Sequence, residues 1–180
     1  DDQLAKLRDG IRGMAKEIPS SANEIAGIAE AAGQLGIKTD NILTFTRTMA
    51  DLGVATNLAG DEAASTLAKF ANITQMPQEQ FSNLGSTIVA LGNNLATTEA
   101  DIAAMSLRLA GAGTQIGMTE ADILAFAGAL SSVGIEAEAG GSAFSRLMSD
   151  MQLAVETNSK SLNKYAKVAG KSGAEFKKAF

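Results

Sequence analysis

The sequence predicts an all-α fold of about seven to nine short antiparallel helices, packed as a compact bundle or a short helical array. Apolar residues recur at the 3.6-residue spacing of a helix along the chain, and strict alternation of apolar and polar residues is nearly absent. Alanine is abundant and valine is scarce, which favours helices over strands. Glycines follow the apolar stripes at short intervals, so we expect the helices to be short and to turn back on one another.

Seven apolar stripes mark the predicted helices in chain order. They are Ile25, Ile28, Ala32 and Leu35; Ile42, Phe45, Met49 and Leu52; Leu67, Phe70, Ala71 and Ile73; Phe81, Leu84, Ile88 and Leu91; Ile102, Met105 and Leu109; Ile123, Phe126, Leu130 and Val133; and Phe144, Leu147, Met148, Met151 and Val155. Residues at this spacing share one face of a helix, so we expect each stripe to face the core. The uncharged stretch 123–135 is shorter than the ~20 residues that span a bilayer, and it predicts a buried helix.

Four glycines are predicted to end helices. Each comes just after an apolar stripe and is followed by an apolar residue: Gly36, Gly53, Gly117 and Gly134. Glycine adopts the left-handed conformation of the C′ position without steric cost, and the next side chain then folds back on the last turn.

Helix starts are predicted from capping residues. The pairs are Ser21 with Glu24, which fits a capping box, and Thr98 with Asp101 and Thr119 with Asp122, which resemble it. The segments 98–102 and 119–123 have the same sequence, and we interpret them as two helix starts of similar chemistry rather than as a full solenoid repeat. Pro77 suits the first turn of a helix, where its missing N–H costs nothing.

The composition excludes most catalytic chemistry. The chain has no cysteine and no histidine, which rules out disulfides, thiolate zinc sites, cysteine nucleophiles and triads that need imidazole. The remaining candidates are the acid pairs Glu99 with Asp101 and Glu120 with Asp122. Because residues two apart do not share a helix face, we interpret both pairs as first-turn caps.

Two glycine-rich stretches also fail as binding motifs. The stretches 111–114 and 140–142 lack a preceding strand and the lysine and hydroxyl pair of a phosphate loop. We interpret 140–142 as a hinge or a close approach between helices. The sequence therefore predicts no catalytic, cofactor-binding or metal-binding residue, and we expect a protein that is not an enzyme.

Charge is distributed unevenly along the chain, whose net charge is −5. The last 21 residues contain Lys160, Lys164, Lys167, Lys171, Lys177 and Lys178 and one acid, Glu175, so residues 160–180 carry +5 and residues 1–159 carry −10. The acidic balance argues against general duplex binding. A lysine-rich end is either a solvated face or an interaction surface.

We divide the chain into three parts. Residues 1–20 are an N-terminal helical segment, 21–157 a core-like helical domain, and 158–180 a lysine-rich C-terminal helical segment. The first residue is not Met, and acids stand where a signal peptide has basic residues. We therefore expect a segment of a longer chain.

The region from Ala22 to Leu153 resembles the core region of phage tail tape-measure proteins. The resemblance is carried by the segments 97–102 (TTEADI), 117–124 (GMTEADIL) and 132–147 (SVGIEAEAGGSAFSRL), in that order, and by the glycine-apolar pairs near residues 36 and 53. It implies a structural component of a phage or prophage tail that sets tail length, occupies the tail tube and leaves with or before the DNA at infection.

The resemblance also implies partners and a location. These are the tail tube protein, tail-tip or baseplate proteins, tail assembly chaperones, other copies of the chain and the host membrane during ejection, with no specific nucleic-acid site in this segment. The location is the virion, in the tail lumen or at the tip, and the host cytoplasm during assembly. It leaves open whether the domain stays folded at one end of the tail or opens inside the tube.

Two other classes of function remain as alternatives. One is a non-enzymatic α-helical interaction module of a bacterial adaptor, which would offer an apolar groove to a partner helix. The other is a carboxylate-dependent hydrolase, which would require two acids in one cleft with a raised pKa.

Overall fold

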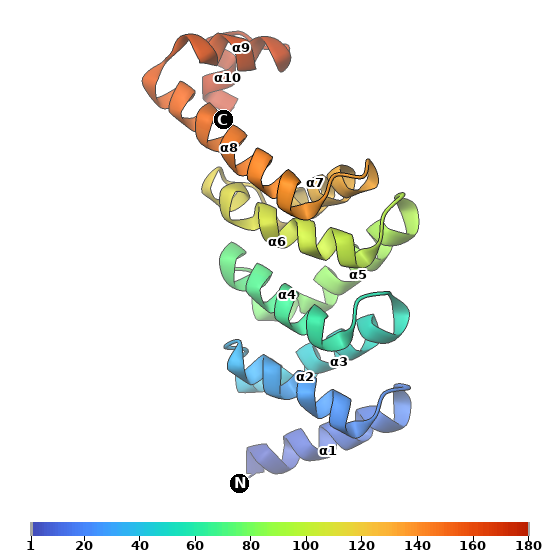
Figure 1. The fold of residues 1–180 in the computed structure, drawn as a ribbon. Helices are drawn as coiled ribbons and strands as arrows, with labels where there is room; N and C mark the ends of the chain where they lie inside the picture. The colour runs from blue at the N-terminus through green and yellow to red at the C-terminus, as the bar shows by residue number, and fades with distance from the viewer. Residues whose placement is uncertain (1, 180) are drawn as a thin grey trace.

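A computed structural model describes residues 2–179, which form ten α-helices joined by short turns (Figure 1). The helices are α1 (Asp2–Glu17), α2 (Ala22–Gln34), α3 (Thr39–Ala55), α4 (Gly60–Thr74), α5 (Phe81–Asn94), α6 (Glu99–Gln115), α7 (Glu120–Ser132), α8 (Ala137–Thr157), α9 (Lys160–Val168) and α10 (Gly173–Ala179), with a 3₁₀ turn, η1 (Gln78–Gln80), before α5. No strand occurs among these residues, which confirms the all-α prediction. The count exceeds the expected seven to nine because the lysine-rich segment forms two helices.

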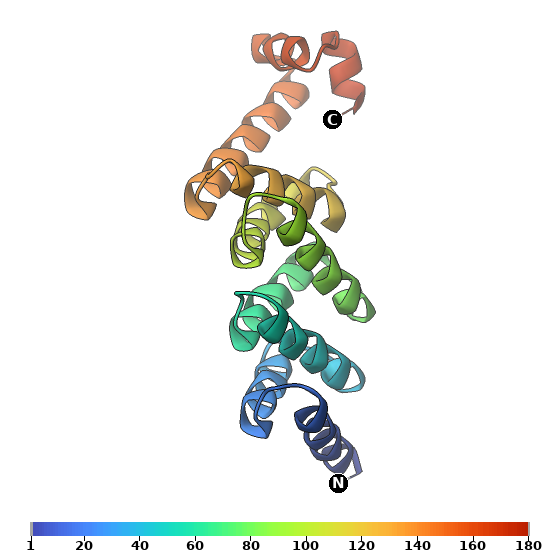
Figure 2. The ribbon, with the colours of Figure 1, turned by 90° about the vertical axis from the view of Figure 1, so that its right-hand side faces the viewer.

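Helices α1 to α8 stack as an array of two layers (Figures 1 and 2). The odd-numbered helices form one layer and the even-numbered helices form the other. Each of these helices from α3 onward packs on the previous helix of its own layer, and helices of the two layers also contact each other. Of the two predicted arrangements, the structure shows the array. Helices α9 and α10 lie beyond the α7–α8 end (Figure 1).

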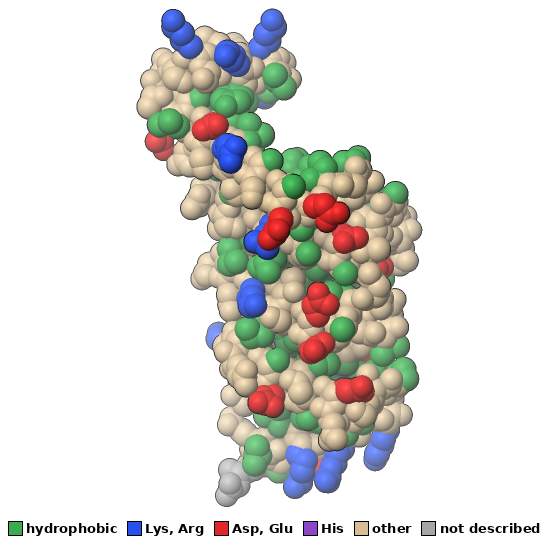
Figure 3. Space-filling model, in the orientation of Figure 1, with side chains coloured by type: hydrophobic (Ala, Val, Ile, Leu, Met, Phe, Trp, Pro, Cys, Tyr) green, Lys and Arg blue, Asp and Glu red, His purple; other side chains and the backbone are tan. Residues whose placement is uncertain are grey.

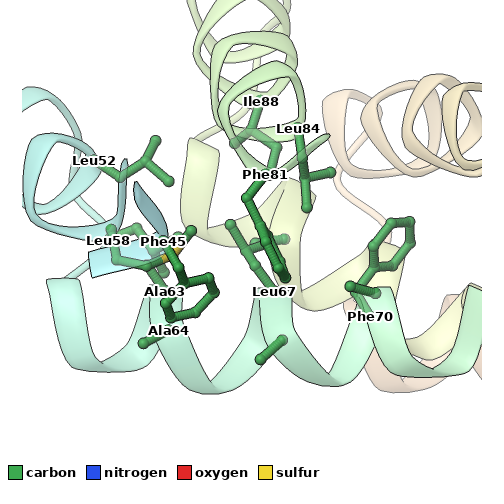
Figure 4. Close-up of a cluster of buried hydrophobic side chains, with 14 of the residues drawn as sticks. Phe45, Leu52, Leu58, Ala63, Ala64, Leu67, Phe70, Phe81, Leu84 and Ile88 are labelled. Carbon is green, nitrogen blue, oxygen red and sulfur yellow. The ribbon is translucent and has the colours of Figure 1, made fainter. Parts of the chain in front are cut away.

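A single apolar core runs through the array between the layers. At its centre, Phe45 of α3 meets Phe81 of α5 edge-on, with ring centroids 4.6 Å apart, beside Leu67 of α4 (Figure 4). Alanines fill much of the remaining interface, so helices approach closely while each residue buries little area. The stripes of α2, α3, α5 and α6 face this core as predicted.

The glycine stops are confirmed at three positions and wrong at one. Gly36, Gly117 and Gly134 have φ between +79° and +83°, and each following residue donates its N–H back to the last helical turn. Gly53 instead lies inside α3, which continues to Ala55. A Cβ at Gly53 would lie 2.9 Å from the backbone nitrogen of Gly60, so this glycine permits close contact between α3 and the start of α4.

The predicted helix starts are confirmed. Ser21 with Glu24, and Thr119 with Asp122, form complete capping boxes, and the Thr98 hydroxyl accepts a hydrogen bond from the N–H of Asp101. The two copies of the repeated sequence therefore begin α6 and α7 with the same chemistry. Pro77 precedes η1, which leads directly into α5.

The stripe predicted for α7 is wrong for two of its four residues. Ile123 is fully buried and Leu130 packs against the core, but Phe126 is 40% and Val133 72% exposed. The residues that face the array are Ile123, Leu124, Ala127 and Gly128. Because α7 is apolar on both sides, the sequence did not distinguish its packed face from its exposed one. The prediction that 123–135 is a buried helix is therefore only half right.

Close packing of α8 on α6 depends on two adjacent glycines. A Cβ at Gly141 would lie 2.6 Å from the Cβ of Arg108, and one at Gly140 would lie 2.8 Å from the terminal carbon of Met105. Arg108 also pairs with Glu138 at 3.2 Å across the same interface. Of the two interpretations of 140–142, close approach is the one that the structure shows.

We predict opposite effects of two glycine-to-alanine changes. Gly141→Ala should destabilise the chain by about 1–3 kcal/mol, because the new methyl group forces α8 away from α6. Gly111→Ala, in α6 where a Cβ meets nothing within 4 Å, should stabilise it by up to about 1 kcal/mol through helix propensity. Urea unfolding followed by circular dichroism measures both. Equal stabilisation by the two changes would contradict close packing at Gly141.

We also predict a pH dependence that comes from the caps. Hydrogen bonds from the backbone N–H and the hydroxyl of Ser21 lower the pKa of Glu24, and Ser172 does the same for Glu175. A lowered folded-state pKa stabilises the fold above the unfolded-state value, and this stability is lost as the pH falls through the folded-state value. The melting temperature should therefore exceed that of Glu24→Gln at neutral pH, and the difference should shrink below about pH 4.

The matched control for this measurement is Glu156→Gln, which removes a carboxylate near the C-terminal end of α8 that caps no helix. A Glu24→Gln difference that stays constant from neutral to acid pH would contradict the role of the cap.

Candidate interaction surfaces

Of the four acids that were weighed as catalytic candidates, Asp101 and Asp122 serve as helix caps, whereas Glu99 and Glu120 lie in the same first turns without a capping hydrogen bond among the described residues. The Asp101 and Asp122 carboxylates each accept a hydrogen bond of 2.7 Å from the threonine hydroxyl three residues earlier. The hydroxyl of Thr119 and its backbone N–H lower the pKa of Asp122, which is the direction opposite to that needed for a general acid. Among residues 2–179, no group of three or more acidic side chains gathers as a metal site would require.

The grooves of the array also offer little chemistry. One groove of about 380 Å³ lies between α3 and α5, lined mainly by small and apolar residues such as Leu52, Gly85 and Val89. Asp51 is the one ionisable residue in this lining. A single carboxylate has no partner for acid and base catalysis there.

A larger groove, of about 630 Å³ beside α2, α3 and α4, has two acids in its lining, Glu24 and Asp61. Hydrogen bonds from Ser21 lower the pKa of Glu24, which is the direction opposite to that needed for a general acid. The surfaces of the molecule are therefore better candidates for function than its grooves.

Acidic side chains gather along one edge of the array (Figure 3). The even-numbered helices run in the same direction, so their N-termini follow one another along this edge (Figure 1). The first-turn acids there include Glu24 of α2, Asp61 and Glu62 of α4, Glu99 and Asp101 of α6, and Glu138 of α8. Acids at helix N-termini are stabilised by the helix dipole. The edge is thus a consequence of first-turn acids at successive helix N-termini, and it gives the array one acidic side.

The six lysines of the C-terminal segment belong to a small separate unit, here called the basic unit, which is formed by α9, α10 and the turn between them (160–179). All six lysine side chains are exposed, and none forms an ion pair within the described part of the chain. Leu162, Ala166 and Phe176 of this unit form a core together with Ala154 of α8, and this core is distinct from the core of the array. Only α8 joins the two, and its residues between the two cores, such as Ser149, Gln152 and Leu153, are largely exposed.

The outer side of α7 is a second candidate surface, called here the α7 face: Ala125, Phe126, Ala129 and Val133. It contains no charged residue, and hydrophobic side chains are visible at this end of the array beside α8 (Figure 3). One edge of this face packs against α8, because the rings of Phe126 and of the buried Phe144 lie 5.3 Å apart.

The opposite end of the array has a different surface. The first helix, α1, exposes the charged residues Lys6, Arg8, Arg12 and Lys16, and Lys and Arg side chains cover that end (Figure 3). Terminal helices of stacked arrays need a polar outer side to stay soluble. The α1 end has such a side, and the α7 end does not.

Sequence reasoning missed two features of these surfaces. The α7 face was assigned to the core. The weak amphipathicity of α7, which has apolar residues on both sides, indicates in the sequence that one apolar side could remain exposed. Ser172 with Glu175 begins α10 as a capping pair, and the S-x-x-E spacing identifies it in the sequence.

We predict that the basic unit opens independently of the array. Its core of four buried residues is small, so amide hydrogens in α9 and α10 should exchange about a hundredfold faster than those of α4. Leu162→Ala should accelerate exchange only in and around the basic unit, whereas the matched change Leu67→Ala should accelerate it across the array. Mass spectrometry of peptides measures both. Equal protection of the amide hydrogens of α4 and α9 would show that the array and the basic unit unfold as a single cooperative unit, which would contradict this prediction.

Comparisons with known proteins agree with the resemblance seen in the sequence. The profile of the family described as phage-related minor tail protein matches residues 8–180. A protein described as a probable tape measure protein, from Halomonas phage phiHAP-1, is 30% identical over 93 residues, which cover 47% of this chain and 11% of that protein.

No solved structure matches the chain. Within residues 2–179, no helix is both long and apolar enough to span a membrane. Because the family profile covers nearly the whole sequence, the chain belongs to the family of phage-related minor tail proteins.

Proposed function

We propose that the chain is a helical domain of a tail tape-measure protein: it occupies the tail tube, contributes to tail length, and leaves the tail with or before the DNA. The observation that carries this proposal is the similarity to a protein described as a tape measure, within a family of minor tail proteins. The matched residues cover only 11% of that relative, so the activity of a whole tape-measure protein is part of the proposal.

The architecture supports a structural role rather than an enzymatic one. Of the acids considered for catalysis, Asp101 and Asp122 are hydrogen-bonded as helix caps, and the chain has neither cysteine nor histidine. We therefore propose that the domain is not an enzyme. The virion is its location, with partners in the tail tube, at the tail tip or baseplate, and among the assembly chaperones. The same features disfavour the hydrolase alternative, and family membership disfavours an adaptor outside the virion.

The array also supports opening inside a tube. Helices of a stacked array contact mainly their neighbours, so the stack can separate step by step without breaking distant contacts. Each helix keeps its own backbone hydrogen bonds as its neighbours separate. The opened domain would therefore be an extended chain that is still helical. Alanine-rich interfaces lower the cost of each step, because they bury little apolar area.

We predict that tail length follows the number of residues in this domain. An in-frame deletion of α3 and α4 (39–74) from the phage gene should shorten the tail by about 50 Å, since an extended helix rises 1.5 Å per residue. A duplication of α5 and α6 (81–115) should lengthen it by a similar amount. Electron microscopy of purified virions measures both changes.

Comparing the deletion with the duplication separates an effect on tail length from damage to the folding of the domain. A deletion that only disrupts the domain would reduce the yield of tails without a defined change in length, and the duplication would not lengthen them. Normal, infectious tails of unchanged length from both variants would overturn the tape-measure role, and a domain that stays folded at the tip would account for them.

A further inference from the structure

We propose that the α7 face is an interface between two copies of this chain, related by a two-fold axis and reinforced by the basic unit of each copy lying beside the acidic array of the other. This inference goes beyond the tape-measure role and does not depend on it.

The first argument is that the array lacks a helix on α7. Along the odd layer, α3 packs on α1, α5 on α3 and α7 on α5, so each of these earlier helices is covered by the next. The following helix, α9, does not continue the layer, because α8 is longer than α2, α4 or α6 and carries α9 away to pack with α10. The side of α7 that a further helix would cover remains exposed, with Val133 at 72%.

The second argument concerns the chemistry of the partner. An uncharged face of alanines with Phe126 and Val133 requires an apolar partner, and Ala125 and Ala129 allow a helix to approach closely. The other large exposed apolar residues include Leu4, Val54, Ile73 and Val168, which belong to four different helices. The α7 end is the place where such residues gather, since Ile135 and Leu147 lie on the adjoining turn and on α8. The best apolar match on a second copy is therefore the same face, which gives a two-fold pairing.

The third argument is the area that a dimer needs. A 13-residue helix is about 20 Å long and about 10 Å wide, so one side of α7 offers a partner only a few hundred Å². Stable interfaces bury about 1,200 Å² or more in total. Pairing of α7 with its copy is thus too small alone, and other surfaces must contribute.

Charge supplies the additional contact. The basic unit projects beyond the α7 end of the array (Figures 1 and 3), so in a head-to-head pairing it must run beside the partner's array. Residues 160–180 carry +5 and residues 1–159 carry −10. The six exposed lysines have no ion pair within residues 2–179 of their own copy. Each copy therefore offers the basic surface that fits the acidic surface of the other.

The test is the oligomeric state of the chain, measured by sedimentation equilibrium across the micromolar range. We expect a dimer that weakens as salt rises above about 0.1 M, because the charged contacts are screened. Val133→Lys should weaken dimerisation at least about tenfold. The matched control Leu4→Lys changes an equally exposed apolar residue at the other end and should leave the dimer intact.

Two further variants test the geometry. In a two-fold pairing, a residue near the axis meets its own copy, so Ala129→Cys should form a disulfide-linked dimer on oxidation in this cysteine-free chain, whereas Leu4→Cys should not. Reversing charge with Lys164→Glu and Lys167→Glu together should weaken the dimer and flatten its salt dependence.

Circular dichroism melts show whether each variant is folded, and only folded variants are compared. A chain that stays monomeric at low salt throughout the micromolar range would overturn the proposal and point to a segment of a longer parent chain as the cover of α7. Equal loss of dimer in Val133→Lys and Leu4→Lys, or equal cross-linking of the two cysteine variants, would also overturn it.

Discussion

Stacking of each helix on its predecessor is the interaction on which the rest of this structure depends. The helices of the array are 13–21 residues long, and helices of this length are marginal in water by themselves. They persist because an apolar stripe of each is buried against neighbours before and after it. Glycines determine how the helices are arranged. Gly36, Gly117 and Gly134 end helices and turn the chain, while Gly53 and Gly141 let neighbouring helices approach closely.

This dependence explains what the sequence revealed and what it did not. Local chemistry predicts the turns and caps well, because Ser21 with Glu24 or Gly117 before Met118 act within a few residues. Stripes such as Ile42 to Leu52 predict the core face where only one side of the helix is apolar. In α7 both sides are apolar, so its orientation depended on tertiary contacts. Gly53 misled for a related reason, because a glycine before an apolar residue also occurs where two backbones approach closely.

The candidate surfaces were less predictable than the fold. The lysine-rich end was evident from composition, but its separation from the array depends on the length of α8 and on a second small core around Phe176. The acidic edge follows from acids in the first turn of each even-numbered helix of the array, yet its continuity arises only because these helices are parallel (Figure 1). The contrast between a charged α1 end and an apolar α7 end appears only when the order of stacking is known.

Reactivity of single thiols on α7 tests the central account most directly, since the chain has no cysteine of its own. Ala127, fully buried, and Ala129, exposed, lie two residues apart on opposite sides of this helix. In dilute, monomeric protein, Ala129→Cys should react with a thiol reagent nearly as fast as an unfolded peptide, and Ala127→Cys should react orders of magnitude more slowly. Slow reaction at both positions, or a reversed order, would contradict an array that ends with one side of α7 uncovered.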